Sequence, residues 1–300
     1  MKITESLLRF ICEHADDDPE RLLLSAKRYE GVDVPFAARQ ILIRKRIRDK
    51  LPSWHANPSI IFPGRTASEQ CSSEQTARYK QRLLESEKHL CDLTGGLGID
   101  TYFFSQCVEQ ISYVELSEMY FETAMYNFSV LQAGNINGYQ GDAVNMIKQF
   151  DSADVFFIDP ARRGEGNTRV FALSDCDPDL CIILPELLKR APKVIAKLSP
   201  MLDIRHTLKL LPQTAAVHVV SVRNECKELL FVLTPEVHAE PRIHCVNYMT
   251  GGTEQSFSFQ LSEEHTCRQI IADSIDLYLY EPDASVLKAG AYKQTALQKG

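Results

Sequence analysis

A glycine-rich turn between a short apolar strand and a helix is the feature that most constrains the fold. Residues 88–101 read KHLCDLTGGLGIDT, with three glycines within four positions. Glycine has no Cβ, so such a turn can bend sharply and let a ligand approach the backbone closely. The helix that follows has free N–H groups at its N-terminus. The pattern therefore predicts a strand over residues 89–93, a helix over 99–106, and a nucleotide-type loop between them.

The spacing of the glycines and the acid before them narrow the kind of ligand. A dinucleotide-binding loop has the form G-x-G-x-x-G, whereas this chain has G-G-x-G. Asp92 lies just before the turn, where a carboxylate would repel a pyrophosphate but could pair with the cationic amino-acid group of S-adenosylmethionine. The stretch resembles motif I, D-x-T-G-G-x-G-x-D, of the class I S-adenosylmethionine-dependent methyltransferases. A glycine turn in an unrelated α/β protein is the alternative.

Two further acids follow predicted strands in the order that the methyltransferase pattern requires. Glu115 ends a strand at residues 111–116 and lies 115 − 98 = 17 positions after the last glycine; a carboxylate there can accept both ribose hydroxyls. Asp142 follows a strand at 136–139, where the pattern has an acid that bonds the adenine amino group. The alternatives are an exposed strand-end acid and an ordinary Gly-Asp turn. The residues expected to bind the cofactor are Asp92, Thr94, Gly95, Gly96, Gly98, Asp100, Glu115, Leu116, Asp142, Ala143 and Asp159.

A fourth strand at residues 153–158 runs into DPARR at 159–163. Ligands of open doubly wound sheets bind beyond the carboxyl ends of the strands where the strand order reverses, so we expect Asp159 to face the glycine turn. Amino methyltransferases have Asp-Pro-Pro-Tyr or Asn-Pro-Pro-Tyr here, and hold the acceptor amine with the polar side chain and a backbone carbonyl. The resemblance makes Asp159 and Pro160 the expected catalytic residues. Arg162 stands where that pattern has an aromatic residue. Its planar guanidinium would stack on the base in place of the aromatic ring, or would bind a phosphate.

The same segment is also similar to the Asp-Pro-Pro-Arg of uridine C5 methyltransferases, which need a cysteine nucleophile after strand five. Residues 197–200 read KLSP at that place and contain no thiol, while Cys176 and Cys181 precede the strand. We expect these cysteines to be ordinary packing or surface residues, and a nitrogen to be the methyl acceptor. The expected substrate-binding residues are Arg162, Arg163 and Lys197. A solvated strand-end lysine is the alternative for Lys197.

The alternation of strands and helices from residue 90 predicts an α/β fold with a parallel sheet covered on both faces. Two final strands form an antiparallel hairpin, which marks the doubly wound class I methyltransferase sheet and is usually missing from dinucleotide-binding folds. Beyond the elements named above, we expect helices at 118–132, 178–190 and 202–211, and strands at 193–198, 215–222 and 228–233.

Residues 1–86 predict an N-terminal helical domain. Helices are expected at 3–14, 18–28, 36–51 and from about 73 to 87, with a proline-rich connector at 52–64. The third helix contains the basic run RKRIRDK at 44–50, which could contact a phosphate backbone; a solvated helix face is the alternative. In the segment EQCSS at 69–73, a serine can cap the fourth helix. Gln70, Ser73 and Thr76 are candidates for lining the site, with capping as the alternative role.

Residues 236–300 have a different character. We expect short strands at 244–249 and 256–260, a helix at 266–277, and no terminal element after residue 287. The segment resembles the start of the THUMP-like module that follows the catalytic domain in a family of bacterial methyltransferases. That family also has an N-terminal helical part, a Glu-Gln-x-Ser-Ser-like stretch, and Asp-Pro-Ala-Arg and Lys-Leu-Ser-Pro motifs, here at 69–73, 159–162 and 197–200. The implied domains are 1–86, 87–235 and 236–300, the last a partial substrate-binding module.

Composition excludes several other classes of protein. No apolar run reaches the roughly 18 residues that span a bilayer, and the acidic N-terminus does not resemble a secretory signal. The nine cysteines form no C-x-x-C pair and the eight histidines lack metal-ligand spacing, which favours reduced thiols in the cytoplasm and predicts no metal. With a net charge of −7, any contact with nucleic acid must come from a local basic patch.

Together, these patterns predict an S-adenosylmethionine-dependent methyltransferase that modifies a base nitrogen of tRNA or rRNA by direct in-line transfer. The RNA substrate follows from the family resemblance and from the paired arginines at 162–163, and net charge contributes nothing to it. The alternatives are a methyltransferase acting on a protein or small molecule, and a cofactor- or RNA-binding protein without catalysis.

Overall fold

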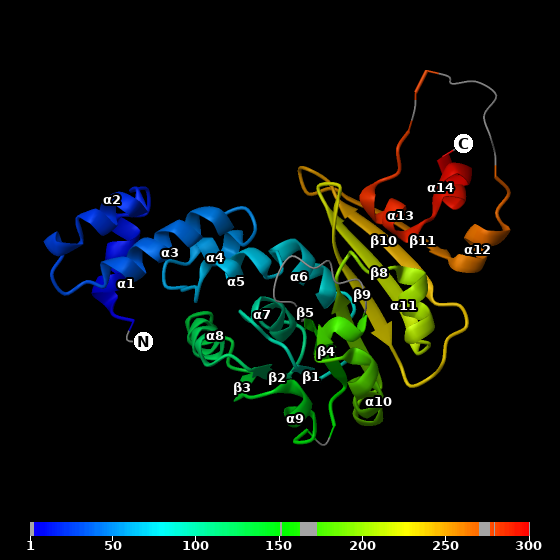
Figure 1. The fold of residues 1–300 in the computed structure, drawn as a ribbon, viewed down its shortest axis with the longest axis horizontal. Coiled ribbons are helices and arrows are strands. Elements are labelled where there is room, and N and C mark those ends of the chain that lie inside the picture. The colour runs from blue at the N-terminus through cyan, green and yellow to red at the C-terminus, as the bar shows by residue number, and fades with distance from the viewer. Residues whose placement is uncertain (1–2, 151, 163–172, 270–276, 279, 300) are drawn as a thin grey trace. The chain divides into compact units, whose positions relative to one another are not determined.

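The computed structural model describes residues 3–150, 152–162, 173–269, 277–278 and 280–299. The chain forms two compact units, drawn in Figure 1. Unit 1 comprises Met1–His89 and Gly95–Asp142, and unit 2 comprises Leu90–Thr94 and Ala143–Gly300. The boundary crosses the glycine turn, since Thr94 and Gly95 are consecutive residues.

Unit 1 is mainly helical and contains two parallel strands. Asp18, Asp33, Ser73 and Ser117 each cap a helix by accepting a backbone N–H with the side chain, as polar N-cap residues do. The helices are α1 (Glu5–Glu13), α2 (Pro19–Leu24), η1 (Ala26–Arg28), α3 (Val34–Ile47), α4 (Pro52–Ala56), α5 (Arg65–Gln70), α6 (Glu74–Gln81), α7 (Ile99–Ser105) and α8 (Glu118–Val130), and the strands are β2 (Gln110–Glu115) and β3 (Ile136–Gln140).

The proline-rich connector predicted at 52–64 is wrong over residues 52–56, which form α4, while residues 57–64 form neither helix nor strand. Pro52 occupies the first turn of α4, where its fixed φ suits a helix and its missing N–H costs nothing. The third helix also ends at Ile47 and the fourth at Gln81, several residues earlier than predicted. Pro52 therefore begins a helix at the position where the connector was predicted to start.

One hydrophobic core joins the N-terminal helices to the helix after the glycine turn. Trp54 and Phe62 are buried in the same cluster as Leu97 and Ile99. Asn127 of α8 adds a polar link, since its side chain donates to the Ile61 carbonyl at 2.9 Å and accepts the Ile61 N–H at 3.0 Å. The packing of α3 to α6 therefore fixes the start of α7.

Unit 2 is a sheet of parallel and antiparallel strands in the order β11-β10-β8-β9-β7-β4-β1. Strands β1, β4 and β7 are parallel, and β9 runs antiparallel to both β7 and β8, which confirms the expected hairpin. Its turn contains Arg223 and Asn224 at positive φ, as a tight two-residue turn requires. The strands are β1 (His89–Asp92), β4 (Val155–Ile158), β7 (Lys193–Leu198), β8 (Thr214–Val222), β9 (Glu225–Leu233), β10 (Arg242–Tyr248) and β11 (Glu254–Gln260).

A separate two-stranded pairing follows β4. Strand β5 (Ala161–Arg162) runs antiparallel to β6 (Cys176–Asp177), with η2 (Leu173–Asp175) just before β6. The helices of unit 2 are α9 (Ala143–Ile147), α10 (Leu180–Arg190), α11 (Ile204–Leu210), α12 (Leu261–Thr266), α13 (Ala284–Ala289) and α14 (Tyr292–Lys299). Within the described ranges, no helix has both the length and the apolar character needed to cross a bilayer.

The C-terminal strands continue the sheet. β10 lies parallel to β8 over seven residue pairs, β11 is antiparallel to β10, and α13 packs on β8, β9 and β10. The absence of a terminal element was predicted wrongly: Asp283 caps α13, Gly290 ends it in a left-handed conformation, and α14 follows (Figure 1). Part of the helix predicted at 266–277 lies outside the described residues. The division into domains 1–86, 87–235 and 236–300 stays a prediction.

Candidate functional site

The glycine turn is shaped by a tyrosine that packs beneath it. A Cβ on Gly95 would lie 2.0 Å from Cε2 of Tyr113, so only glycine fits there. The Tyr113 hydroxyl donates to the Gly96 carbonyl at 2.6 Å, and the ring is fully buried. Gly96 and Gly98 both have positive φ, and Gly98 is the N-cap residue of α7. Sequence reasoning missed Tyr113, because a tyrosine inside a strand looks like ordinary core.

Glu115 is oriented by two backbone N–H groups. Gly96 N donates to its Oε2 at 2.8 Å and Ser117 N to its Oε1 at 2.7 Å. A carboxylate has about four acceptor positions, so two bonds leave capacity for a ligand hydroxyl. The next residue, Leu116, has a 68% exposed side chain, which offers an apolar surface beside the acid.

Asp142 lies next to the end of β2. Gly141 N donates to the Glu115 carbonyl at 3.0 Å, which brings the start of the Gly-Asp segment beside the strand that ends in Glu115. Asp142 is exposed and Ala143, the first residue of α9, is buried. In unit 1, the structure thus brings together the glycine turn, Glu115 and Asp142.

Asp100 lies in a buried ion-pair network. Lys80 Nζ is 3.0 Å from Asp100 Oδ1, Ser72 Oγ donates to Oδ2 at 2.6 Å, and Lys80 also donates to Ser72 Oγ at 3.1 Å. The Lys80 side chain is fully buried. The stretch at 69–80 therefore reaches the helix after the glycine turn through Ser72 and Lys80, while Ser73 caps α6. Neither Ser72 nor Lys80 was predicted to have this role.

In unit 2, Thr94 joins the end of β1 to the end of β4. Thr94 Oγ1 accepts the Asp159 N–H at 2.6 Å, and the Thr94 N–H is donated to Asp92 Oδ1 at 3.2 Å. Asp92 itself is 1% exposed, so its carboxylate orients the residue that leads into the glycine turn. Asp159 accordingly lies beside Thr94. Thr94 is the residue that precedes Gly95 in the chain.

Asp159 forms an ion pair with Lys197 of β7 through its Oδ2. The Asp159 side chain is 39% exposed and that of Lys197 14% exposed, so the carboxylate has an accessible side while the ammonium is mostly covered. Lys197, predicted to contact substrate phosphate, thus lies against the expected catalytic acid. This ion pair could not be predicted from the sequence, because its two residues are 38 positions apart.

The residues after Asp159 are held by strand pairing. Pro160 is buried, and β5 places Arg162 opposite Cys176 of β6. Arg163, predicted to bind substrate, lies outside the described residues. The segment that carries Pro160 is therefore fixed on both sides, by the Thr94 bond before it and by the β5–β6 pairing after it.

The thiols near these residues are poorly suited to be nucleophiles. Burial raises the pKa of Cys91 well above its usual value, and the Asp92 charge adds to this. Burial, followed by the Asp179 charge, also raises the pKa of Cys181, and Cys176 is buried. A raised pKa leaves less thiolate at neutral pH. Over the described ranges, no group of three or more His, Cys, Asp or Glu side chains could hold a metal ion.

Comparison with solved structures gives an extensive match. The crystal structure of a presumed methyltransferase from Porphyromonas gingivalis W83 superimposes with a TM-score of 0.88 at 33% identity, over 99% of this chain and 76% of that one. The chain belongs to this family of methyltransferases. The match also confirms the expected class I α/β methyltransferase fold.

Other solved structures share less of the fold. An rRNA methylase from Streptococcus thermophilus has a TM-score of 0.39 at 12% identity, over 53% of this chain and 93% of its own. A SAM-dependent methyltransferase from Agrobacterium tumefaciens has a TM-score of 0.39 at 15% identity, over 62% of this chain and 58% of its own. No protein-family model and no curated protein matches the chain.

Proposed function

We propose that the chain transfers a methyl group from S-adenosylmethionine to a nitrogen of an RNA base, with tRNA or rRNA as the substrate. The observation that carries the proposal is the position of Asp159, which a backbone bond to Thr94 and an ion pair with Lys197 hold at the end of β4. Membership of the methyltransferase family supports methyl transfer, and Asp159 supports the nature of the acceptor.

The residues around the glycine turn fit this cofactor. When bound, S-adenosylmethionine supplies an electrophilic methyl group on its sulfonium. The glycines at 95, 96 and 98 let a ligand approach the backbone, and Glu115 keeps acceptor positions for ribose hydroxyls while Gly96 and Ser117 orient it. Leu116 offers an apolar contact for the adenine, and Asp142 an acceptor for its amino group. Asp92 and Thr94 hold the turn, and Asp100 holds the start of α7.

Asp159 and Pro160 position the acceptor. The Asp159 carboxylate and a backbone carbonyl accept N–H bonds from an exocyclic or ring amine, which aims the nitrogen lone pair. Methyl transfer is an in-line displacement, and holding the reacting atoms about 3 Å apart supplies most of the catalysis. Lys197 keeps the carboxylate in place. Because the pKa values of Cys91 and Cys181 are raised, direct transfer to nitrogen is favoured over covalent attack at C5.

The RNA substrate is the finer part of the proposal. Its support is the family resemblance carried by the 69–73, 159–162 and 197–200 motifs, which resemble those of a family of bacterial methyltransferases, together with the arginines at 162 and 163. Residues 236–300 take the role of a THUMP-like substrate-binding module within this proposal. The nine cysteines, none of them in a C-x-x-C pair, support a reducing, cytoplasmic setting.

Two measurements test the proposal. Calorimetry should show that the wild-type chain and Asp159→Ala bind S-adenosylmethionine, while Glu115→Ala binds it at least tenfold more weakly because the ribose acceptor is lost. Labelled methyl should enter total RNA about a hundredfold more slowly with Asp159→Ala, since the acceptor is no longer aimed. Glu30→Ala, at an exposed acid outside the candidate site, is the matched control and should leave both quantities unchanged.

The outcomes separate the competing functions. No binding of S-adenosylmethionine by the wild type would defeat every methyltransferase mechanism. Cofactor binding with label entering protein or small molecules would defeat the RNA substrate alone. Cofactor binding without transfer to any fraction would indicate a binding protein that lacks catalysis.

A further inference from the structure

The C-terminal half of α3 and the turn that follows it gather positive charge in a chain of net charge −7. Five cations lie within residues 44–50, and they line two hollows in unit 1, of about 160 Å³ and about 530 Å³. The first contains Arg46 and Lys50, and the second contains Arg44, Lys45 and Arg48. With roughly 100° between successive helical residues, Arg44 and Arg46 of α3 lie about 160° apart around the helix, so the two hollows lie on opposite sides of its end.

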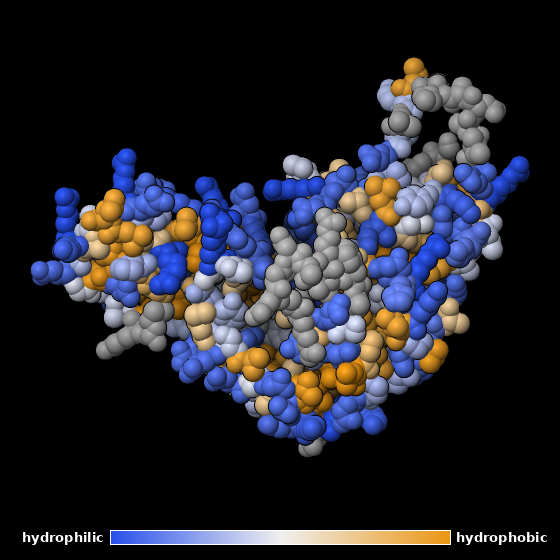
Figure 2. Space-filling model, viewed as in Figure 1, coloured by the Kyte–Doolittle hydropathy of each residue, from blue (hydrophilic) through white to orange (hydrophobic). Residues whose placement is uncertain are grey.

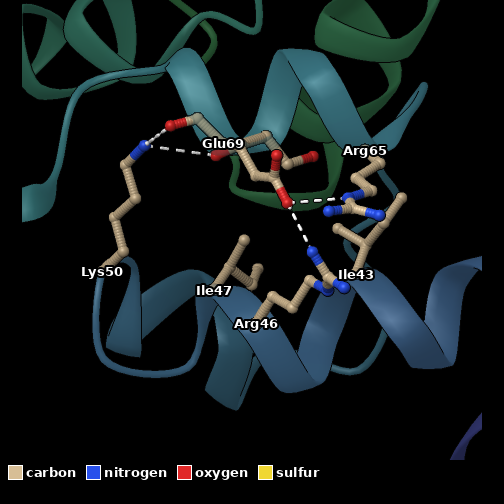
Figure 3. Close-up of a pocket in the computed structure, with 7 residues that line it drawn as sticks. Ile43, Arg46, Ile47, Lys50, Arg65 and Glu69 are labelled. Carbon is tan, nitrogen blue, oxygen red and sulfur yellow. Dashed lines mark hydrogen bonds and ion pairs between the residues drawn. The ribbon is translucent and has the colours of Figure 1, made fainter.

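The smaller hollow is shown in Figure 3. Arg46 Nη1 and Arg65 Nε both bind Glu69 Oε1, at 2.6 and 2.8 Å, and Lys50 Nζ donates to the Glu69 carbonyl at 2.5 Å. Ile43 and Ile47 also line this hollow, and both are buried. Three cations and one carboxylate line this hollow, which leaves it with a net positive charge.

The larger hollow has a fixed cation at its base. The Arg44 guanidinium donates to the carbonyls of Ile60, His55 and Asn57 at 2.7 to 2.9 Å. Arg48 and Lys45 are exposed, and Asp16 is the acid among the lining residues. Burial lowers the pKa of His55, and the charges of Arg44 and Arg48 lower it further. The field in this hollow is thus positive as well.

The positive charge here exceeds what the C-terminus of one helix needs. The C-terminus of a helix carries about half a negative elementary charge, which a single side chain offsets. Across both hollows, six cations face two carboxylates, Glu69 and Asp16. The exposed surface over α2 differs in character: Leu24 is 90% exposed there, and Figure 2 shows apolar residues gathered over that helix.

We infer that the C-terminal half of α3, with its two hollows, holds the phosphate backbone of the RNA substrate, an inference that rests on the proposed function. A free phosphate ion would occupy only one of the two hollows. A ligand that binds both hollows must carry several negative charges in succession along a chain, as the phosphate backbone of RNA does. Arginine forks bind phosphate oxygens in pairs. Glu69 occupies the place of such a phosphate between Arg46 and Arg65, and exposed ion pairs of this kind are weak enough to be exchanged.

A salt titration tests this surface. The probe is a fluorescein-labelled 20-nucleotide oligouridylate, and its binding is followed by anisotropy at increasing salt. Arg46→Gln/Arg48→Gln removes one exposed cation from each hollow, and Arg9→Gln/Arg21→Gln removes the same charge from α1 and α2 as the control. The slope of log K against log salt should shrink by between one and two in the first variant, as each phosphate contact is lost, and stay at the wild-type value in the control.

Glu69→Gln gives a change of opposite sign. Removing this carboxylate frees two guanidiniums for phosphate, so binding at low salt should strengthen severalfold. Glutamine is a good helix former and these positions are exposed, so thermal midpoints of all variants should agree with the wild type.

The inference is overturned if the two double variants have equal slopes, or if Glu69→Gln leaves affinity unchanged. It is also overturned if polyglutamate of equal length competes as well as RNA, which would point to an acidic protein partner. Calorimetry with S-adenosylmethionine on the same preparations keeps the two proposals apart. If the variants still bind S-adenosylmethionine but the slope of log K against log salt for RNA is unchanged, only the inference about this surface is wrong. If the wild type does not bind S-adenosylmethionine, the proposed function itself is wrong.

Discussion

Tyr113 limits which residue can follow Thr94. Its ring fills the space where a side chain on residue 95 would go, and its hydroxyl binds the turn at Gly96. The same backbone is tied to β2 by the Gly95 N–H, which donates to the Val114 carbonyl at 2.9 Å. Residue 95 can therefore move only if the turn leaves the strand.

Gly95→Ala should weaken binding of S-adenosylmethionine at least tenfold and destabilise the fold by about 1 to 3 kcal/mol, as overpacked cores do. Calorimetry and urea denaturation measure the two effects. Gly134→Ala is the matched control, because a Cβ there meets nothing within 4 Å. Equal behaviour of the two variants would contradict the role assigned to Tyr113.

A second residue-scale prediction concerns the buried charge of Lys80. Lys80→Met leaves the Asp100 carboxylate without its cation, and breaking a buried pair in this way costs about 3 to 5 kcal/mol. Lys88→Met breaks the exposed pair with Glu109 and should cost at most about 1 kcal/mol. Urea denaturation measures both. Adding Asp100→Asn to Lys80→Met should restore most of the lost stability; no recovery would show that the charge was not the cause.

At the scale of elements, β10 completes the edge of β8. Seven residue pairs join the two strands, and α13 covers β8, β9 and β10. A strand edge stripped of its partner exposes a row of backbone N–H and C=O groups, which is a template for aggregation. Residues 236–300 therefore stabilise the sheet, independently of any ligand that they bind.

A chain that ends at residue 235 should aggregate on size-exclusion chromatography or melt well below the full chain, because the edge of β8 and the face under α13 become exposed. Co-expression of residues 236–300 as a separate polypeptide is the control, and it should restore solubility. A monomeric truncated chain with an unchanged melting temperature would instead support an independent C-terminal domain.

The order of the elements could be predicted better than their contacts. Carboxyl ends of parallel strands meet at one edge of a sheet, so the glycine turn, Glu115 and Asp159 could be recognised as strand-end residues without a structure. Lys80 carries no such sign, since a lysine in a polar helix usually faces water and its partner Asp100 is 20 positions away. The helices α4 and α14 were missed because short helices depend on caps and tertiary packing more than on periodicity.

At the scale of the whole molecule, a stacked histidine pair makes stability depend on pH. The rings of His218 on β8 and His244 on β10 lie 4.5 Å apart at an interplanar angle of 12°. His244 Nδ1 is 2.8 Å from Ser258 Oγ. Burial, followed by the charge of His244, lowers the pKa of His218 to about 3. Burial and Arg242 lower the pKa of His244 as well.

The free energy of unfolding should fall as pH drops below about 6.5, where an unfolded histidine takes up a proton and the folded His218 does not. Between pH 6.5 and the folded pKa of about 3, the unfolded state binds more protons, so acid favours unfolding. His218 alone contributes a loss of about 2 kcal/mol by pH 5. In the variant His218→Phe, the slope of the free energy of unfolding against pH should be shallower, by the equivalent of about one proton at pH 5. Urea denaturation between pH 5 and 7 measures this slope. An unchanged slope would mean that other groups cause it.

The ion pair between Lys80 and Asp100 also has an evolutionary consequence. Each charge lies in a site that tolerates it only while the other is present, so a lineage that changes one position passes through a poorly folded intermediate. The two positions should therefore be inherited together among descendants of a common ancestor. Where one of them has become apolar, we expect the other to have lost its charge as well.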